Sequence, residues 1–358
     1  MRVLVAMSGG VDSSVAAKLL VSQGNECIGC TMRLFDNEDA GISQESTCCS
    51  LKDVNDARSV SYELGMQYYV FNFKDGFKEK VMDKFVDSYL KGMTPNPCID
   101  CNKYMKFDKL YERAVELSCD HIATGHYARI EKVKDKYLLK KALDETKDQS
   151  YVLYSLTQNQ LAHTLFPLGE LRKTETRKIA EENGFVNADK PDSQDICFVP
   201  NGDYASIIEM LSGKKSEPGN FVDTSGKVLG RHKGIINYTI GQHKGLGLSL
   251  PFSMYVKKID VDKNEVVLCE EKELFAHDVY VEDFNWISGE VPIEPLRCKA
   301  KIRYRQQEKE AIVTPVGDNK IHIHFDEPQR AITPGQSAVL YDGDVVLGGG
   351  TIVSNNNY

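Results

Sequence analysis

The sequence has no apolar run of the roughly 20 residues that a membrane-spanning helix needs. Its first apolar run, "MRVLVAM", is short and leads directly into glycines, so it does not resemble a secretory signal. Positive charge is also scarce, because 44 Lys and Arg stand against 52 Asp and Glu, a formal net charge of −8. These absences argue against a membrane partner and against indiscriminate nucleic-acid binding, and they predict a cytoplasmic protein. A local basic face remains compatible with a nucleic-acid substrate.

Two familiar motifs are missing as well. There is no Walker loop, GxxxxGK followed by Ser or Thr, and no histidine spacing typical of a metal site. The ten cysteines are expected to be reduced thiols, because no secretory signal accompanies them. Most of them, including Cys48 and Cys49, are expected to be ordinary core or surface residues.

The first part of the chain alternates between strand-like and helix-like patterns. Short apolar runs rich in β-forming residues predict strands at 2–7, 27–35, 67–73 and 121–126. Helical spacing predicts helices at 13–24, 51–65, 77–92 and 106–117. This order predicts an α/β fold with a doubly wound parallel sheet, whose ligands bind at the carboxyl ends of the strands.

The rest of the chain has a different pattern. A hairpin is predicted at 127–143, and helices are predicted around 151–164 and 173–183. From about Asn220 the chain is rich in short strands and glycines, and its last part predicts a small β-barrel. We therefore expect a catalytic domain, a small central domain and a barrel domain, at 1–205, 206–270 and 271–358.

The string "MSGGVDSS" joins the first predicted strand to the first predicted helix. A glycine-rich turn at that place directs backbone N–H groups toward a phosphate. Gly9 and Gly10 permit close approach, and Asp12 and Ser13 supply polar groups for a phosphate or a metal. The simpler interpretation is a strand-to-helix turn that binds nothing.

Three cysteines stand in suggestive surroundings. Cys98 and Cys101 form a CxxC motif after two prolines, and Cys197 lies far downstream in "DSQDICF". The CxxC motif by itself fits a redox site, a metal site or chance, and no fourth ligand for a zinc ion is evident. A reactive thiol must be partly thiolate at neutral pH. The Asp residues beside Cys197 therefore require a compensating cation or helix N-terminus, which the sequence does not identify.

Several strings, taken in order, resemble one family. "SGGVDSS" resembles the pyrophosphate loop of the ATP pyrophosphatases, which cleave ATP between the α and β phosphates. Together with "TPNP", "CNKYMKF", "ATGHYAR", "KDQSY", "KPDSQDICF", "YTIGQ", "RYR" and "TPGQ", it resembles the tRNA-specific 2-thiouridylases over nearly the whole chain. The resemblance implies an enzyme that uses ATP and Mg²⁺ to adenylate O2 of the wobble uridine of tRNA. Sulfur then replaces that oxygen, and AMP and pyrophosphate are released. The implied partners are this tRNA and a sulfur donor, which is a cysteine desulfurase, a relay protein or sulfide.

The resemblance also assigns roles to residues. The predicted ATP-binding residues are Ala6, Met7, Ser8, Gly9, Gly10, Val11, Asp12, Ser13, Met32 and Gly125. The predicted target-base residues are Asn96, Pro97 and Cys98. The predicted tRNA contacts are His126, Lys147, Asp148, Gln149, Tyr304, Arg305 and Gln336. Without the resemblance, each of these tRNA residues fits an ordinary structural or solvated position.

Two routes for sulfur remain open at this point. In the first, implied by the resemblance, Cys101 is the nucleophile, Cys197 carries a persulfide, and the two can end as a disulfide. In the second, which follows from Cys98 standing where many relatives have Asp, Cys98, Cys101 and Cys197 hold a 4Fe-4S cluster with one open iron. Two other functions are alternatives: another pyrophosphatase-loop ligase, and a non-catalytic nucleotide- or RNA-binding module.

Overall fold

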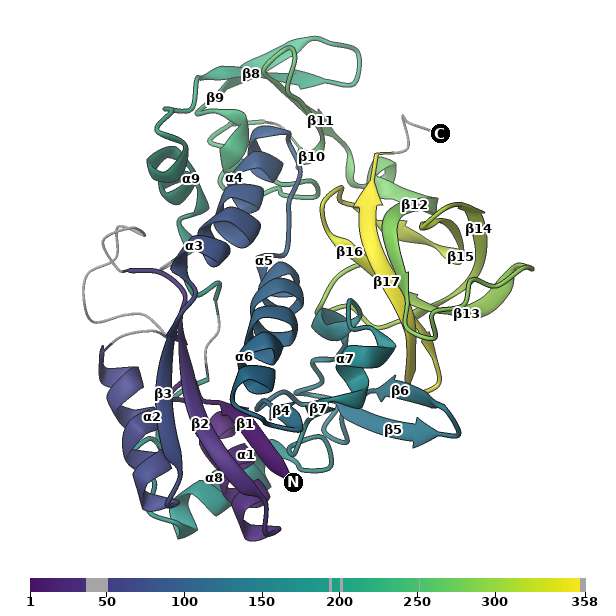
Figure 1. Ribbon diagram of the computed structural model, residues 1–358. Coiled ribbons are helices and arrows are strands. Elements are labelled where there is room, and N and C mark those ends of the chain that lie inside the picture. Colours follow the sequence, from purple (N-terminus) through teal and green to yellow (C-terminus); the bar gives the residue numbers. More distant parts are fainter. Residues whose placement is uncertain (37–50, 193–194, 200–201, 251, 355–358) are drawn as a thin grey trace.

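The computed structural model describes residues 1–36, 51–192, 195–199, 202–250 and 252–354. Figure 1 shows a parallel sheet at the lower left, a small sheet at the top and a barrel at the right. Cys48, Cys49 and residues 193–194 of the "DSQDICF" string lie outside the described residues. Within the described part of the chain, no helix is long and apolar enough to cross a membrane.

The N-terminal sheet is parallel, with strand order β3-β2-β1-β4-β7. Its strands are β1 (Arg2–Ala6), β2 (Glu26–Arg33), β3 (Gln67–Asn72), β4 (His121–Ala123) and β7 (Thr164–Leu165). The doubly wound sheet and its four predicted strands are confirmed. The prediction of one helix at 151–164 is wrong, because Thr157 caps a new helix within it. The segment contains η3 (Ser150–Leu153), α7 (Gln158–Ala162) and the unexpected strand β7.

Both faces of this sheet are buried, as is usual for parallel sheets. Val3 and Val5 of β1 belong to one core cluster, whereas Leu4 and Ala6 belong to another. The first cluster includes side chains from α1 (Val11–Ser22), α2 (Leu51–Glu63) and α8 (Lys173–Glu182). The second includes side chains from α3 (Lys74–Phe77), η1 (Lys78–Met82), α4 (Asp83–Leu90) and the helices described next. Successive side chains of β1 thus point to opposite faces of the sheet and pack into two different cores.

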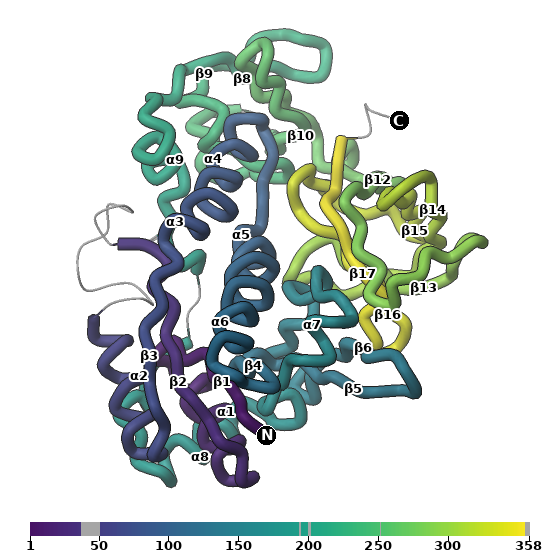
Figure 2. Tube along the Cα trace, viewed as in Figure 1, coloured from purple at the N-terminus to yellow at the C-terminus, as the bar shows by residue number. Residues whose placement is uncertain are grey.

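One continuous helical segment follows the "TPNP" string. It consists of α5 (Pro97–Asp100), η2 (Cys101–Lys109) and α6 (Leu110–Glu116). η2 is a π-helix, in which the N–H of Leu110 bonds to the carbonyl of Met105. Such i→i+5 turns are rare and occur frequently at functional sites. Figure 2 shows this segment along the middle of the molecule, between the parallel sheet and the barrel.

The central part begins with α9 (Tyr204–Ser212), which packs against α4 and spans the predicted boundary at 205. Its sheet has the strand order β10-β11-β8-β9. The elements are β8 (Gly219–Asp223), β9 (Val228–His232), η5 (Ile235–Asn237), β10 (Tyr255–Asp260) and β11 (Glu265–Cys269).

The C-terminal part is a closed barrel, as predicted, because β12 pairs with both β15 and β17. Its elements are η6 (Glu271–Leu274), β12 (Phe275–Trp286), β13 (Leu296–Lys301), β14 (Lys309–Gly317), β15 (Lys320–Arg330), β16 (Ser337–Asp342) and β17 (Val345–Val353). The predicted hairpin is β5 (Arg129–Val133) with β6 (Lys136–Lys140), and β6 pairs with β17. A hairpin from the first half of the chain therefore attaches the barrel beside the parallel sheet.

Candidate active site

Two cavities meet at the N-terminus of α1. The first, called the cysteine cavity here, has a volume of about 370 Å³. The predicted site residues in its lining are Ala6, Met7, Ser8, Asp12, Ser13, Met32, Pro97, Cys98, Cys101, Gly125, His126, Gln149 and Cys197. Predicted ATP, target-base and sulfur-transfer residues thus converge at the carboxyl ends of the parallel strands, where α/β folds bind ligands.

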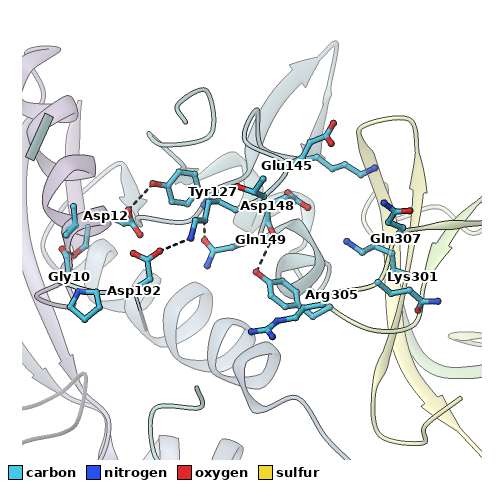
Figure 3. A pocket seen from close by; sticks show the side chains of 18 of the residues that line it. Gly10, Asp12, Tyr127, Glu145, Asp148, Gln149, Asp192, Lys301, Arg305 and Gln307 are labelled. Atoms are coloured by element: carbon cyan, nitrogen blue, oxygen red, sulfur yellow. Dashed lines mark hydrogen bonds and ion pairs between the residues drawn. The ribbon is translucent and has the colours of Figure 1, made fainter. Parts of the chain in front are cut away.

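The second cavity, called the barrel cleft here, has a volume of about 990 Å³ and extends from α1 to the barrel (Figure 3). Its predicted site residues are Ser8, Gly10, Val11, Asp12, Ser13, Lys147, Asp148, Gln149, Tyr304 and Arg305. Its lining also includes the cationic residues Lys141, Lys190, Lys299 and Lys301. Ser8, Asp12, Ser13 and Gln149 line both cavities, so one ligand can extend from the first into the second.

The turn before α1 has the geometry of an anion site. Helix α1 starts after Gly10, which caps it without a side-chain hydrogen bond. Gly9 has a φ of +75°, and a Cβ there would overlap the carbonyl oxygen of Asp53. A Cβ on Gly125, at the end of β4, would lie 2.8 Å from the backbone nitrogen of Ser13. The turn therefore lets a ligand approach its backbone closely, at the positive end of the α1 dipole. A phosphate suits such a place.

An ion-pair network supports the same turn from α8. The Nζ of Lys173, a buried side chain, lies 2.8 Å from both carboxylate oxygens of Asp12 and 2.7 Å from Asp192. The hydroxyl of Tyr127 also donates to Asp12, at 2.9 Å. Arg177 and Lys147 contact Asp192 in turn, at 3.1 Å and 2.8 Å. Asp12 is therefore held in one position at the start of α1.

Two further residues hold the turn and were not expected from the sequence. The Nδ2 of Asn187 donates to the carbonyl of Gly9 at 3.0 Å and to the hydroxyl of Ser14 at 2.9 Å. The Nζ of Lys190 also donates to the carbonyl of Gly9, at 3.0 Å. The sequence indicates a place in the site for Lys190 only because this residue begins the string "KPDSQDICF". It does not indicate that Lys173 and Asn187 support the turn.

The Asp192 carboxylate predicts a specific dependence of stability on pH. Burial alone would raise the pKa of Asp192, but hydrogen bonds from Lys147 and Lys173 prevail and lower it from 3.8 to about 2. A depressed folded-state pKa contributes stability above about pH 4, which is lost as the pH falls toward 2. Asp192→Asn should therefore be less stable than the wild type at pH 6, with the difference shrinking between pH 4 and 2.

Urea unfolding followed by circular dichroism at several pH values measures this difference. The matched control is Asp189→Asn, an exposed position nearby. A deficit in Asp192→Asn that is the same at pH 6 and pH 2.5 would contradict the assignment.

The three singled-out cysteines share the cysteine cavity but differ in exposure. Cys98 is exposed, Cys197 is half-buried, and Cys101, the first residue of η2, is buried. Five other cysteines are buried in the cores: Cys27, Cys30, Cys119, Cys269 and Cys298. Burial raises the pKa of Cys27 and Cys269 to about 11 and that of Cys298 to about 12. Those thiols stay protonated, which supports the expectation that they are structural.

The cluster alternative does not fit this arrangement. Among the described residues, no group of three or more His, Cys, Asp or Glu side chains is placed to hold a metal. A cluster on Cys98, Cys101 and Cys197 needs three thiolates gathered around one core. The described residues therefore do not bring the three thiols together in the way that a cluster with Cys98 as a ligand would need.

The lining of the cysteine cavity also includes a cationic side chain. Lys106 lines the cysteine cavity, and its Nζ lies 3.3 Å from Nε2 of His126. Burial, and then the charge of Lys106, lower the pKa of His126 well below 6.5, so the imidazole is neutral. An ammonium group can only donate, so Nε2 accepts from it, and Nδ1–H faces Thr124 Oγ1 at 2.7 Å. His126, predicted as a tRNA contact, is 7% exposed and orients Lys106 in this structure.

Most of the other residues predicted to contact tRNA line the barrel cleft, and some of them also form hydrogen bonds within the protein. Gln149 accepts from the N–H of Tyr127 at 2.9 Å, and Asp148 accepts from the backbone of Ala142 and Ser150. Tyr304 lies between the barrel strands β13 and β14, and its hydroxyl is 3.4 Å from the carbonyl of Asp148. The roles of Lys147, Asp148, Gln149, Tyr304 and Arg305 in tRNA binding stay predictions.

Besides Gly9 of the turn, two predicted residues are in the lining of neither cavity, as far as the described residues define it. Asn96 caps α5, and its side chain accepts from the N–H of Cys98 at 3.2 Å. Gln336 donates to the carbonyl of Thr94 at 2.7 Å, which ties the barrel to the segment before the cysteines. Their predicted contacts with the base and with tRNA stay predictions.

Three family models match the chain. They are described as the tRNA methyl transferase HUP domain, over residues 1–201, the tRNA methyl transferase PRC-barrel domain, over 209–270, and the Aminomethyltransferase beta-barrel domain, over 276–352. The chain is 53% identical to "tRNA-specific 2-thiouridylase MnmA 1" of Thermoanaerobacter sp., over 98% of this chain and 97% of that protein. It is 52% identical to "tRNA-specific 2-thiouridylase MnmA" of Clostridioides difficile, over 98% of each chain. With identity above half along nearly its whole length, and with the predicted motifs gathered around one cavity, this chain belongs to the tRNA-specific 2-thiouridylase family.

Proposed function

We propose that this chain is a tRNA-uridine 2-sulfurtransferase that uses ATP to convert the wobble uridine of tRNA to 2-thiouridine. One observation carries the proposal: Cys101 and Cys197 line the same cavity as Ser8, Asp12 and Ser13, which flank the glycines of the turn before α1. A phosphate-binding turn beside two thiols suits a reaction in which a substrate is adenylated and then attacked by sulfur. A ligase of another kind would not need the two thiols, and a non-catalytic nucleotide-binding module would need the turn but not the thiols.

In the first step, O2 of the uridine attacks the α-phosphorus of ATP. The bond between this phosphorus and the bridging oxygen breaks, pyrophosphate leaves, and the proton on N3 of the uracil ring is released to solvent water. The close backbone of the turn supports this proposal, because it suits the phosphates of ATP, and Lys173 holds the neighbouring Asp12 in place. Mg²⁺ is expected to accompany ATP. The base must leave the stack of the anticodon loop to enter this site, as in other enzymes that act on a base.

In the second step, a persulfide on Cys197 supplies the sulfur. Its terminal sulfur bonds to C2, the C2–O2 bond breaks, and AMP leaves. The Cys101 thiolate then attacks Sγ of Cys197, which breaks the S–S bond and leaves the sulfur on C2. The resulting disulfide between Cys101 and Cys197 is reduced by an external dithiol before the next turnover. The donor that loads Cys197 is a cysteine desulfurase or a relay protein that itself carries persulfide sulfur, and the reaction takes place in the cytoplasm.

Product analysis tests the function directly. Purified protein, ATP, Mg²⁺, a persulfide donor and unmodified tRNA should yield 2-thiouridine at the wobble position, together with one AMP for each thiouridine formed. Omission of tRNA should abolish AMP formation, which separates an enzyme from a nucleotide-binding module. Thiolation at another position, or AMP formation that is independent of tRNA, would contradict the proposal.

Lys106→Met should lower kcat/KM for thiolation by about a hundredfold, because preorganised cations at developing negative charge contribute on this scale. The ammonium lies in the cavity where charge develops on the phosphate and on the thiolates. Single-turnover thiolation with saturating ATP measures the effect. Lys103→Met, at an exposed position in the same π-helix, is the matched control and should retain full activity. Equal activity of the two variants would remove Lys106 from the mechanism.

Arg305→Ala should weaken tRNA binding about tenfold and lower the salt dependence of binding by about one unit, as expected for a phosphate contact. Arg305 lies in the barrel cleft, at a distance from the turn that would bind ATP (Figure 3). The affinity for ATP should therefore be unchanged. Fluorescence anisotropy with labelled tRNA measures the effect, and Lys178→Ala, an exposed cation on α8, is the control. An unaltered salt slope would remove Arg305 from the tRNA site.

A further inference from the structure

A buried amide in the wall of the cysteine cavity has no role in the steps above. Asn102 follows Cys101 in η2, is 2% exposed and lines the cavity together with the three cysteines. Its Nδ2 donates to the carbonyl oxygen of Val152 at 2.9 Å. A carbonyl oxygen can only accept, so this bond determines which end of the amide carries the hydrogens. The other end of the amide is therefore an acceptor in a fixed place.

That acceptor is unused. Oδ1 of Asn102 is buried and has no hydrogen-bond partner among the described residues. Most buried polar side-chain atoms have a partner, because an unsatisfied one costs free energy. Asn96, in contrast, uses its Oδ1 to cap α5. An unsatisfied acceptor in the wall of a substrate cavity is explained most simply by a donor on the substrate.

We propose that Oδ1 of Asn102 accepts a hydrogen bond from N3–H of the target uracil. The inference deepens the proposed function and rests on it. C2, the atom that receives sulfur, is bonded directly to N3. A base whose C2 is within reach of Cys101 and Cys197 therefore presents its N3–H in this same cavity.

The contact makes Asn102 a specificity-determining residue. Cytosine carries an acceptor at N3 where uracil carries a donor. Facing Oδ1, a cytosine would leave two acceptors without a donor, and sites built around such a bond reject the analogue that lacks the donor. The bond to Val152 prevents the amide from turning its NH₂ toward the base. N3–H and O2 also lie on one edge of uracil, so the same contact orients O2 in the bound substrate, before O2 attacks ATP and N3 loses its proton.

The test measures binding, because a methyl group on N3 would also block adenylation chemically. Anticodon stem-loops carry uridine, N3-methyluridine or 5-methyluridine at the wobble position, and affinity is measured with α,β-methylene-ATP, which cannot be cleaved. The wild type should bind the uridine stem-loop about tenfold more tightly than the N3-methyl stem-loop, which corresponds to one hydrogen bond. In Asn102→Ala this ratio should fall to about one. The 5-methyl stem-loop should bind like uridine to both proteins, which controls for the size of a methyl group.

Asn25→Ala is the matched control and should keep the tenfold ratio, because Nδ2 of Asn25 also donates to a backbone carbonyl, that of Leu20, but Asn25 is in the lining of neither cavity. A wild type without preference for uridine over N3-methyluridine overturns the inference, even if Asn102→Ala does not fold. A preference that survives in Asn102→Ala, or that is lost in Asn25→Ala instead, also overturns it. Wild-type thiolation of the uridine stem-loop with ATP is measured in parallel. Failure there contradicts the proposed function, whereas success combined with loss of the predicted selectivity contradicts only the role of Asn102.

Discussion

Gly125→Ala is expected to lower ATP-dependent pyrophosphate release by about a hundredfold or more, the loss that a displacement of about 1 Å at a reacting centre produces. The added Cβ would lie 2.8 Å from the nitrogen of Ser13 and 2.9 Å from the carbonyl carbon of Asp12. Both are backbone atoms at the N-terminus of α1, so they cannot move aside as a side chain would. The backbone of Gly125 does not need a positive φ, and the effect is therefore one of space alone.

A control variant distinguishes this local effect on ATP binding from a loss of activity caused by misfolding. Gly76→Ala is the matched control, since its Cβ would meet only Met105, at an ordinary 3.6 Å. Both variants should keep the circular dichroism of the wild type, and only Gly125→Ala should lose pyrophosphate release and ATP binding. Pyrophosphate release by Gly125→Ala within threefold of the wild type would mean that ATP does not bind at this turn.

Cys197→Ser is expected to abolish thiolation while tRNA-dependent adenylation continues. The serine hydroxyl cannot carry a persulfide, so sulfur has no route to C2, but the turn that binds ATP is untouched. Cys101→Ser should also abolish multiple turnovers, because nothing then attacks Sγ of Cys197. Pyrophosphate release and thiouridine formation, measured on the same samples, distinguish the two steps.

Cys98→Ser provides the control within the same cavity. In the persulfide route the exposed thiol of Cys98 is not required, and this variant should keep activity within about threefold of the wild type. Complete loss of thiolation in Cys98→Ser, accompanied by loss of iron from anaerobically purified protein, would contradict the persulfide route. It would require the three thiols to gather in a way that the described residues do not show.

Much of the N-terminal fold could be predicted because its signals are local. The apolar run of β1 and the glycines that follow it specify a strand, a tight turn and a helix within a few residues of one another. The prediction failed at β7, where two residues join the sheet only because β4 lies beside them. It also missed the π-helix η2, whose sequence pattern is that of an ordinary helix.

The support of the site could not be predicted, because it depends on residues that meet only in the folded chain. Lys173 and Asn187 contact the turn from more than a hundred residues away, and neither belongs to a string with a recognisable purpose. His126 was assigned to tRNA, yet its neutral ring orients Lys106 inside the cavity. A histidine in a sequence does not reveal whether it faces solvent or a buried ammonium group.

The sequence by itself determined the alternation of the first strands and helices, the change to a β-rich second half, and the side chains available for chemistry: a glycine turn and a small set of thiols. The tertiary structure decided which of the eight described cysteines share a cavity with residues of that turn, which lysine lies in that cavity, and which amide of its lining keeps an unused acceptor. The physical reason is that backbone propensity and side-chain chemistry act within a few residues. Proximity, burial and hydrogen-bond satisfaction arise only when segments far apart in the chain pack together.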